Sequence, residues 1–248
     1  GGRNQKPRKM NSTYKTLRPA ILFLSLVLGT AYGAEDGFVR IFDGKTLKGW
    51  TPVSTQAKDA WVVRDGAILG DGDKGGRCYL AYAENKKIGN FELKFSYRLT
   101  GSKANSGVSI RAVKDPTGKR DFQCYHADLG AIGLGKQVMG AWDFHTPGRK
   151  EHRCFRGDSL VIDKNDKPTI TAIENGLKEE DIRKGDWNAV HLLARGNYFK
   201  FVINGKTSAE FTERLPKERR LHEGMIQLQL HNPKMLAEFK DLRLKILD

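Results

Sequence analysis

The sequence has few cysteines, and its longest apolar stretch is short. Three cysteines occur among 248 residues, at Cys78, Cys124 and Cys154, and no Cys-x-x-Cys pair is present, which argues against a structural zinc site. The odd number leaves at least one thiol unpaired, and the sequence does not decide whether the other two form a disulfide. The apolar stretch 20–28 is well short of the roughly 20 residues that a membrane-spanning helix needs. No stable membrane span is therefore expected once a leader is removed.

Several motifs of well-known catalytic sites are also missing. The sequence contains no Gly-x-Ser-x-Gly elbow, no His-Glu-x-x-His pair and no EF-hand loop. Residues 133–136 read Gly-Leu-Gly-Lys but lack the spacing and the following Ser or Thr of a phosphate-binding loop. Any chemistry must therefore come from side chains scattered over strands and loops.

The N-terminal segment 1–33 has the features of a secretory signal peptide preceded by extra residues. Met10 is the expected start, followed by Lys15 and Arg18, the apolar stretch 20–28 and a small-x-small site that ends at Gly33. The alternative, a buried N-terminal helix, is disfavoured because such a helix should show an amphipathic face. The sequence predicts export to the periplasm or the extracellular space, with one mature domain spanning 34–248.

The chain is strongly basic, with a formal net charge of +14, and loss of six basic residues in the leader would lower it to +8. The lysines and arginines are interspersed with acids, and neither a basic helix nor a ribonucleoprotein aromatic motif is found. A solvated basic surface is favoured over nucleic-acid binding, and no nucleic-acid partner is expected.

The rest of the sequence is dominated by short segments in which apolar and polar residues alternate. In residues 91–99, every second side chain is apolar and those between are polar, which indicates a strand with one buried face. Asn204-Gly205 between two such runs is a hairpin signal. The other runs lie at 38–42, 61–63, 67–69, 79–82, 107–113, 123–129, 160–163, 189–195, 199–203, 225–230 and 238–247. One short helix is expected near 178–184. This pattern predicts an all-β fold with two packed sheets.

Residues 130–158 lack clean periodicity and contain several glycines and histidines together with Trp142. A long irregular segment within a compact domain is typical of a functional loop. We expect this segment to lie over a binding face.

Several segments resemble, in order and spacing, those of one protein family. Residues 38–50 are similar to an apolar strand followed by Phe-Asp-Gly-x-x-Leu-x-Gly-Trp. Residues 125–130, Tyr-His-Ala-Asp-Leu-Gly, are similar to a Tyr-Gln-Ala-Asp-Ile-Gly motif. Further matching segments lie at 61–69, 90–98, 105–111, 186–188, 203–205, 228–231 and 239–243.

These segments identify the chain as resembling the 3-keto-disaccharide hydrolases, also described as 3-keto-glucoside lyase/hydratase domains and formerly as domain of unknown function 1080. The resemblance implies a concanavalin A-like (LamG-like) two-sheet jelly-roll sandwich that acts on sugars oxidised at carbon 3. It departs from the family at residues 140–145, where a Gly-x-Leu-Tyr-Asp-Glu stretch is usual. Depending on a one-residue gap, Asp143 matches the family's acid or His145 takes its place.

Alternation along the strands predicts which polar side chains share a face. If the strands adjoin in one sheet, a polar face is built from Glu92, Arg111, His126, Asp128, Gln229 and His231. The irregular segment could cover it with Trp142, Asp143 and His145. Two simpler readings stay open: Glu92 and Arg111 as a cross-strand charge pair, and His231 as a structural residue.

Such a face suits a sugar, with Glu92, Arg111, Asp143 and Gln229 binding hydroxyls and Trp142 stacking on a ring. The mechanism that the resemblance implies removes the acidic proton at carbon 2, eliminates the carbon 1 substituent and adds water. We expect Asp128 and one histidine to transfer these protons. The candidate catalytic histidines are His126, His145 and His231. A divalent metal is compatible with these residue types, although no ligand spacing requires it. The alternative function is a non-catalytic, lectin-like module for an oligosaccharide or glycoside.

Overall fold

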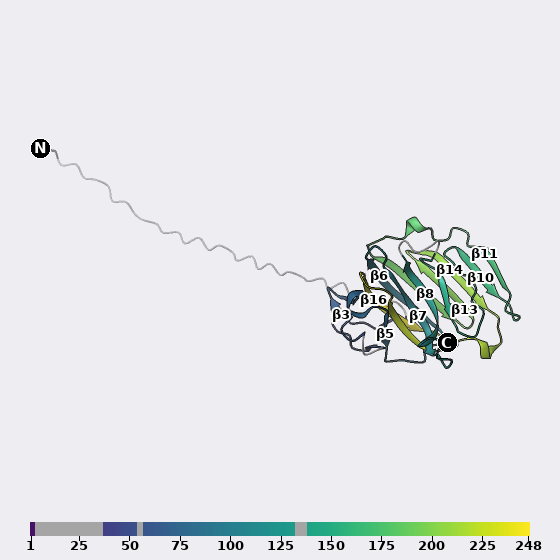
Figure 1. Cartoon of the computed structure of the whole chain (residues 1–248). Coiled ribbons are helices and arrows are strands. Elements are labelled where there is room, and N and C mark those ends of the chain that lie inside the picture. Colours follow the sequence, from purple (N-terminus) through teal and green to yellow (C-terminus); the bar gives the residue numbers. More distant parts are fainter. Residues whose placement is uncertain (3–36, 54–56, 132–137) are drawn as a thin grey trace. The chain divides into compact units, whose positions relative to one another are not determined.

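The computed structural model of the chain describes residues 1–2, 37–53, 57–131 and 138–248 (Figure 1). The predicted cleavage site and nearly all of the predicted leader 1–33 lie outside the described residues. No helix in the described part of the chain has the length and apolar character needed to cross a membrane.

The larger of two sheets is almost wholly antiparallel, with one parallel pair between β10 and β14. Strand β1 pairs with β16, outside the main strand order. The strands in spatial order are β11 (Pro168–Ala172), β10 (Asp158–Ile162), β14 (Lys206–Glu213), β13 (Tyr198–Ile203), β12 (Asn188–Arg195), β6 (Phe91–Thr100), β16 (Leu236–Ile246), β4 (Ala67–Asp71) and β3 (Trp61–Arg64), with β1 at Val39–Arg40.

The smaller sheet is antiparallel and contains six strands. Their spatial order is β2 (Trp50–Pro52), β5 (Cys78–Tyr82), β15 (Met225–Leu230), β7 (Asn105–Lys114), β8 (Phe122–Ala131) and β9 (Trp142–His145). Helical turns in the described residues are short: α1 (Gly72–Gly75) and the 3-10 turns η2 (Glu179–Asp181) and η3 (Lys217–Arg219). The predicted all-β, two-sheet sandwich is confirmed.

The core forms where the apolar faces of the two sheets meet. Strand β6 shows the reason, because each of its odd-numbered residues from Phe91 to Leu99 is buried and the intervening ones are only half-buried. In the smaller sheet, Tyr125 and Ala127 of β8 point into the same core. The opposite face of this sheet is therefore left to the polar members of each strand.

The expectation of one irregular segment over 130–158 was only partly right, because it contains strand β9. Trp142 begins this strand and was predicted to stack on a sugar. That placement is wrong: its ring is 2% exposed, packs edge-on against Phe211, and donates its indole N–H to the carbonyl of Ala209 at 3.2 Å. A four-residue strand is too short for its period to be recognised, and its pleat turns the indole into the core.

A buried charge cluster joins β8 and β14 at one end of the core. The carboxylate of Glu213 is fully buried and accepts hydrogen bonds from the Tyr125 hydroxyl and the Arg149 guanidinium. Removing one partner of such a pair leaves an uncompensated buried charge.

We expect Glu213→Gln to lower the free energy of unfolding by about 3–5 kcal/mol, because it isolates the Arg149 charge. Urea denaturation at pH 7 measures this loss. The double variant Glu213→Gln/Arg149→Met should recover most of the stability, since neither position of the pair then carries a charge. A loss below about 1 kcal/mol for Glu213→Gln alone would contradict this account.

Candidate active site

The outer face of the smaller sheet gathers polar side chains from neighbouring strands. In the register of this sheet, Ser109 lies opposite both Gln227 and His126, and His126 lies opposite Asp143. Two residues before His126 in β8, Cys124 lies opposite His145 of β9. Of the predicted polar face, His126 is thus placed on this side of the smaller sheet, beside Ser109 and Gln227.

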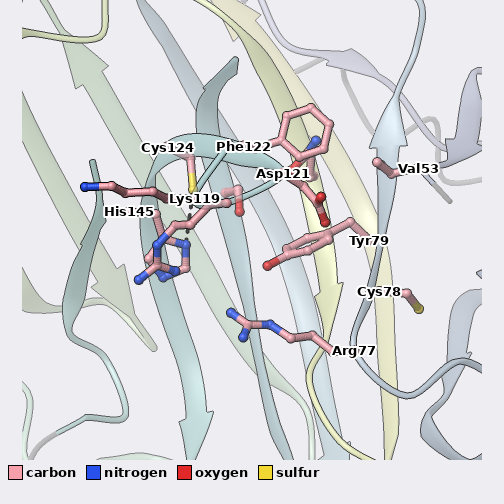
Figure 2. A pocket seen from close by; sticks show the side chains of 12 residues that line it. Val53, Arg77, Cys78, Tyr79, Lys119, Asp121, Phe122, Cys124 and His145 are labelled. Carbon is pink, nitrogen blue, oxygen red and sulfur yellow. Dashed lines mark hydrogen bonds between the residues drawn. The ribbon is translucent and has the colours of Figure 1, made fainter. Parts of the chain in front are cut away.

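A cavity of about 230 Å³ opens on this face (Figure 2). Cys124, His145, Ser109 and Gln227 come from the sheet, while Lys119, Arg120, Asp121 and Phe122 come from the hairpin that joins β7 to β8 and the start of β8. Arg77 and Tyr79 extend from the β5 side toward His145. Ligand sites usually measure about 300–1,000 Å³, so this cavity suits one sugar ring with the remainder of a glycoside outside it.

His145 is held by Asp143 on the same strand. Its Nε2 lies 2.7 Å from Asp143 Oδ2, and its Nδ1 lies 3.5 Å from the Cys124 sulfur (Figure 2). Burial lowers the pKa of His145, but the bonds to Asp143 and Cys124 outweigh burial and raise the pKa from 6.5 to about 9. This pairing stabilises the fold below pH 6.5, and the contribution is lost as the pH rises through about 9.

The Asp143 carboxylate is the ionised partner. Burial raises its pKa, but hydrogen bonds with His145 and Glu151 prevail and bring the pKa below its ordinary value. Because the carboxylate accepts at Nε2, the other ring nitrogen, Nδ1, is the one beside the Cys124 sulfur, and Cys124 also lines the cavity.

His126 lies beneath His145, with the two rings stacked at 4.9 Å between centroids. Its Nδ1 is 3.1 Å from the Ser109 hydroxyl. Burial, followed by the charge of His145, lowers the pKa of His126 to about 3, so this ring is neutral. Gly107 makes room for it, because a Cβ at that position would lie 2.1 Å from His126 Nε2.

Asp128 lies on the same face, opposite Gly107, but does not line the cavity. Its Oδ1 is buried and has no hydrogen-bond partner in the part of the chain that the structure describes. Burial and the nearby Asp143 charge raise the pKa of Asp128 well above its ordinary value. Asp128 therefore keeps its proton to a higher pH than an ordinary carboxyl group does, beside an ionised carboxylate, an arrangement that suits a division of acid and base roles between two carboxyl groups.

Cys124, His126 and His145 each place a potential metal ligand within 4.8 Å of the others. The two imidazole planes are stacked and differ by only 13°. A ring nitrogen binds a metal along a lone pair in the plane of its ring, so two stacked rings cannot both reach one ion. The side chains as arranged do not fit a metal centre that uses both histidines, and no step is assigned to one.

Two further candidates border the site. Gln229 is buried and donates to the Tyr79 hydroxyl at 3.2 Å. His231 is half-buried just beyond β15, and burial together with the charges of Arg77 and His145 lowers its pKa. Both lie near the cavity lining rather than in it.

The predicted positions of Glu92 and Arg111 are wrong. Glu92 belongs to the larger sheet, where its carboxylate lies 2.7 Å from His191 Nε2. Arg111 lies in β7, but a bulge between Ile110 and Val113 gives it a positive φ of 48° and interrupts the alternation. Its guanidinium instead reaches the carbonyl oxygens of Gly89, Gly196 and Leu221.

Sequence reasoning missed most of the cavity's lining. Cys124 could have been found, because it precedes His126 by two residues and so shares its face. Arg77, Lys119 and Arg120 are exposed and lie just outside strands, where alternation gives no signal. All three cysteines are buried and free, so no disulfide joins them.

Comparison with known proteins gives a family and a fold. A family model described as the 3-keto-alpha-glucoside-1,2-lyase-like domain matches residues 37–245. A 3-keto-disaccharide hydrolase from Bacteroides thetaiotaomicron is 34% identical, in a match that covers 86% of this chain and 79% of that protein.

Solved structures of low sequence identity share the sandwich. A provisionally named glycosyl hydrolase from Parabacteroides distasonis has a TM-score of 0.55 at 19% identity, over 86% of this chain and 95% of that one. A Bacillus subtilis protein of unknown function with a galectin-like fold has a TM-score of 0.52 at 13% identity, over 81% and 90%. These likenesses support the predicted jelly-roll architecture.

Proposed function

The chain belongs to the 3-keto-alpha-glucoside-1,2-lyase-like family, and from this premise we propose that it cleaves 3-keto-glycosides, 3-keto-disaccharides among them, in the cavity beside His145. The observation that carries this proposal is the orientation of His145. Asp143 anchors Nε2, and Nδ1 lies beside the sulfur of Cys124, which lines the cavity together with His145; a histidine held in this way by a carboxylate is suited to act as a general base.

In this mechanism, His145 Nδ1 removes the proton from carbon 2, which the ketone at carbon 3 makes acidic. Asp143 holds the ring and stabilises the imidazolium that forms. The negative charge of the enolate develops in a cavity lined by the cationic side chains of Arg77, Lys119 and Arg120. Their charges lower the energy of the enolate.

Asp128 supplies the complementary acid. Its raised pKa favours the protonated carboxyl group, and its Oδ1 has no hydrogen-bond partner among the described residues. As the carbon 1 bond breaks, Asp128 donates a proton to the departing oxygen, with the second sugar lying along the face outside the cavity. Water then adds to the unsaturated sugar to complete the hydrolysis.

The pH dependence tests the assignment of His145. A base whose pKa is about 9 must first lose its proton, so kcat/KM is expected to rise with pH and to reach half of its maximum near pH 9. Asp143→Asn removes the carboxylate that raises this pKa and should move the rising limb to lower pH. Kinetics from pH 5 to 10, with NMR titration of the His145 ring, measure both shifts. A rate that falls as the pH rises toward 9 would assign His145 as an acid instead.

The activity itself is tested by incubation with a 3-keto-disaccharide and with its unoxidised parent in heavy water. Release of monosaccharide from the keto sugar alone, with deuterium at carbon 2 of the product, is the expected result. Release without deuterium would indicate direct displacement at carbon 1. Binding of the sugar without release would favour the alternative function, a lectin-like module.

We also propose export to the periplasm or the extracellular space. The basic flank, apolar stretch and small-x-small site of residues 1–33 support this proposal. N-terminal sequencing of protein from an exporting host should begin near Ala34. Secreted material that still begins at Met10 would exclude cleavage at the proposed site.

A further inference from the structure

A second cavity, of about 390 Å³, shares no lining residue with the first. It lies where the segment before β6, the β12–β13 turn and the η3 region meet. Its side chains include Arg111, Lys217, Arg220 and His222, and none of the described residues that line it is acidic. The cavity therefore concentrates positive charge.

Arg111 forms the buried part of the cavity, with only 2% of its surface exposed. Its guanidinium donates to three backbone carbonyls and stacks over the Phe199 ring at 4.7 Å. Its remaining nitrogen, Nη2, has only a long contact of 3.4 Å to the Asn90 side chain. These partners are neutral, whereas buried charges are normally paired with an opposite charge.

The buried carboxylate of Glu213 acts on Arg111 through its charge, but no hydrogen bond joins the two among the described residues. Glu213 is already bonded to Arg149 and Tyr125, as described above. Arg111 also adopts a left-handed backbone conformation, which costs a residue other than glycine about 1–3 kcal/mol. Within the described residues, this strained position thus holds a buried cation that is hydrogen-bonded to no carboxylate.

Arg220 adds an unsatisfied donor. Its Nε is buried and forms no hydrogen bond with any described residue. His222 donates its Nε2–H to the carbonyl of Lys217 at 2.7 Å, which ties together the segment that carries Lys217 and Arg220. An unpaired buried donor is unfavourable, so the described residues leave part of the Arg220 guanidinium unsatisfied.

We propose that this cavity binds a doubly charged tetrahedral oxyanion, either free phosphate or sulfate or the same group carried on a sugar. Arg220 and Lys217 contact its oxygens, and Arg111 supplies a fixed positive charge beside them. Two negative charges suit the excess of cations, and a guanidinium matches the geometry of such oxygens. This site is independent of the proposed 3-keto-glycosidase activity.

The test is titration of the purified chain with sodium phosphate, sodium sulfate or sodium chloride at constant ionic strength. Calorimetry and thermal unfolding should show saturable binding and a raised Tm with phosphate and sulfate but not with chloride. Arg220→Gln is expected to weaken phosphate binding about tenfold or more, because it removes charge-assisted hydrogen bonds. Lys217→Gln should weaken it as well.

Lys164→Gln is the matched control, since Lys164 is exposed in the β10–β11 turn and the substitution removes the same charge. It should leave phosphate affinity unchanged. Glucose 6-phosphate distinguishes the two forms of the ligand. If its affinity equals that of free phosphate, the site recognises the anion alone; if its affinity is higher, the site recognises a phosphate ester on a sugar. Equal responses to phosphate and chloride, or wild-type phosphate affinity in Arg220→Gln, would overturn the proposal.

Discussion

His145→Gln is expected to lower kcat/KM for a 3-keto-disaccharide about 10²–10⁴-fold, the range that positioned acid–base groups contribute. Glutamine has a similar reach and can still donate to Asp143, but it has no nitrogen able to accept a proton near neutral pH. The loss should fall mainly on kcat, because the cations that hold the sugar remain in place. Steady-state kinetics at pH 9, where wild-type His145 is half deprotonated, show the effect most clearly.

The chain offers a matched control for this variant. His152 is also buried and lies 2.6 Å from a carboxylate, that of Asp166, but neither residue lines the cavity. His152→Gln should therefore lower Tm and leave kcat/KM within a few-fold of wild type. Equal activity losses in the two variants would mean that His145 serves only the fold.

Asp128→Asn should lower turnover at least about a hundredfold without destabilising the protein. The raised pKa of Asp128 means that the folded protein binds a proton here which the unfolded chain releases. The contribution of Asp128 to the free energy of unfolding therefore falls as the pH rises above the ordinary carboxyl pKa. Asparagine removes that penalty and keeps the shape, so the Tm of the variant at pH 7 should equal or exceed that of wild type.

Asp158→Asn is the control for Asp128→Asn, and its expected effects on stability and turnover are the reverse. Asp158 is buried in the larger sheet and accepts hydrogen bonds from Arg153 and from the Phe155 amide. Its loss should lower Tm with little effect on turnover. If Asp128→Asn keeps nearly full activity, Asp128 is only a structural acceptor and the general acid lies elsewhere.

The alternation of apolar and polar residues predicted much of the fold, because the side of a strand that faces the core depends on residues close together in the chain. Alternation in β6 and β8 shows which side chains face the core, and both predictions are confirmed. It also placed His126, Asp128 and Gln229 on an outer face, where the structure shows them. Short strands such as β9 give too few residues for a period, so His145 was expected in a loop.

The sequence alone therefore determined the all-β class, the family and the polar side of individual strands, since each depends on residues close together in the chain. Only the tertiary structure decided which strands adjoin. Glu92 has the expected alternation but lies in the other sheet, and the bulge in β7 sends Arg111 away from the catalytic face. Strand pairing joins residues far apart in sequence, so the cavity that His145 shares with Arg77 arises only when β5 and β9 are placed in one sheet.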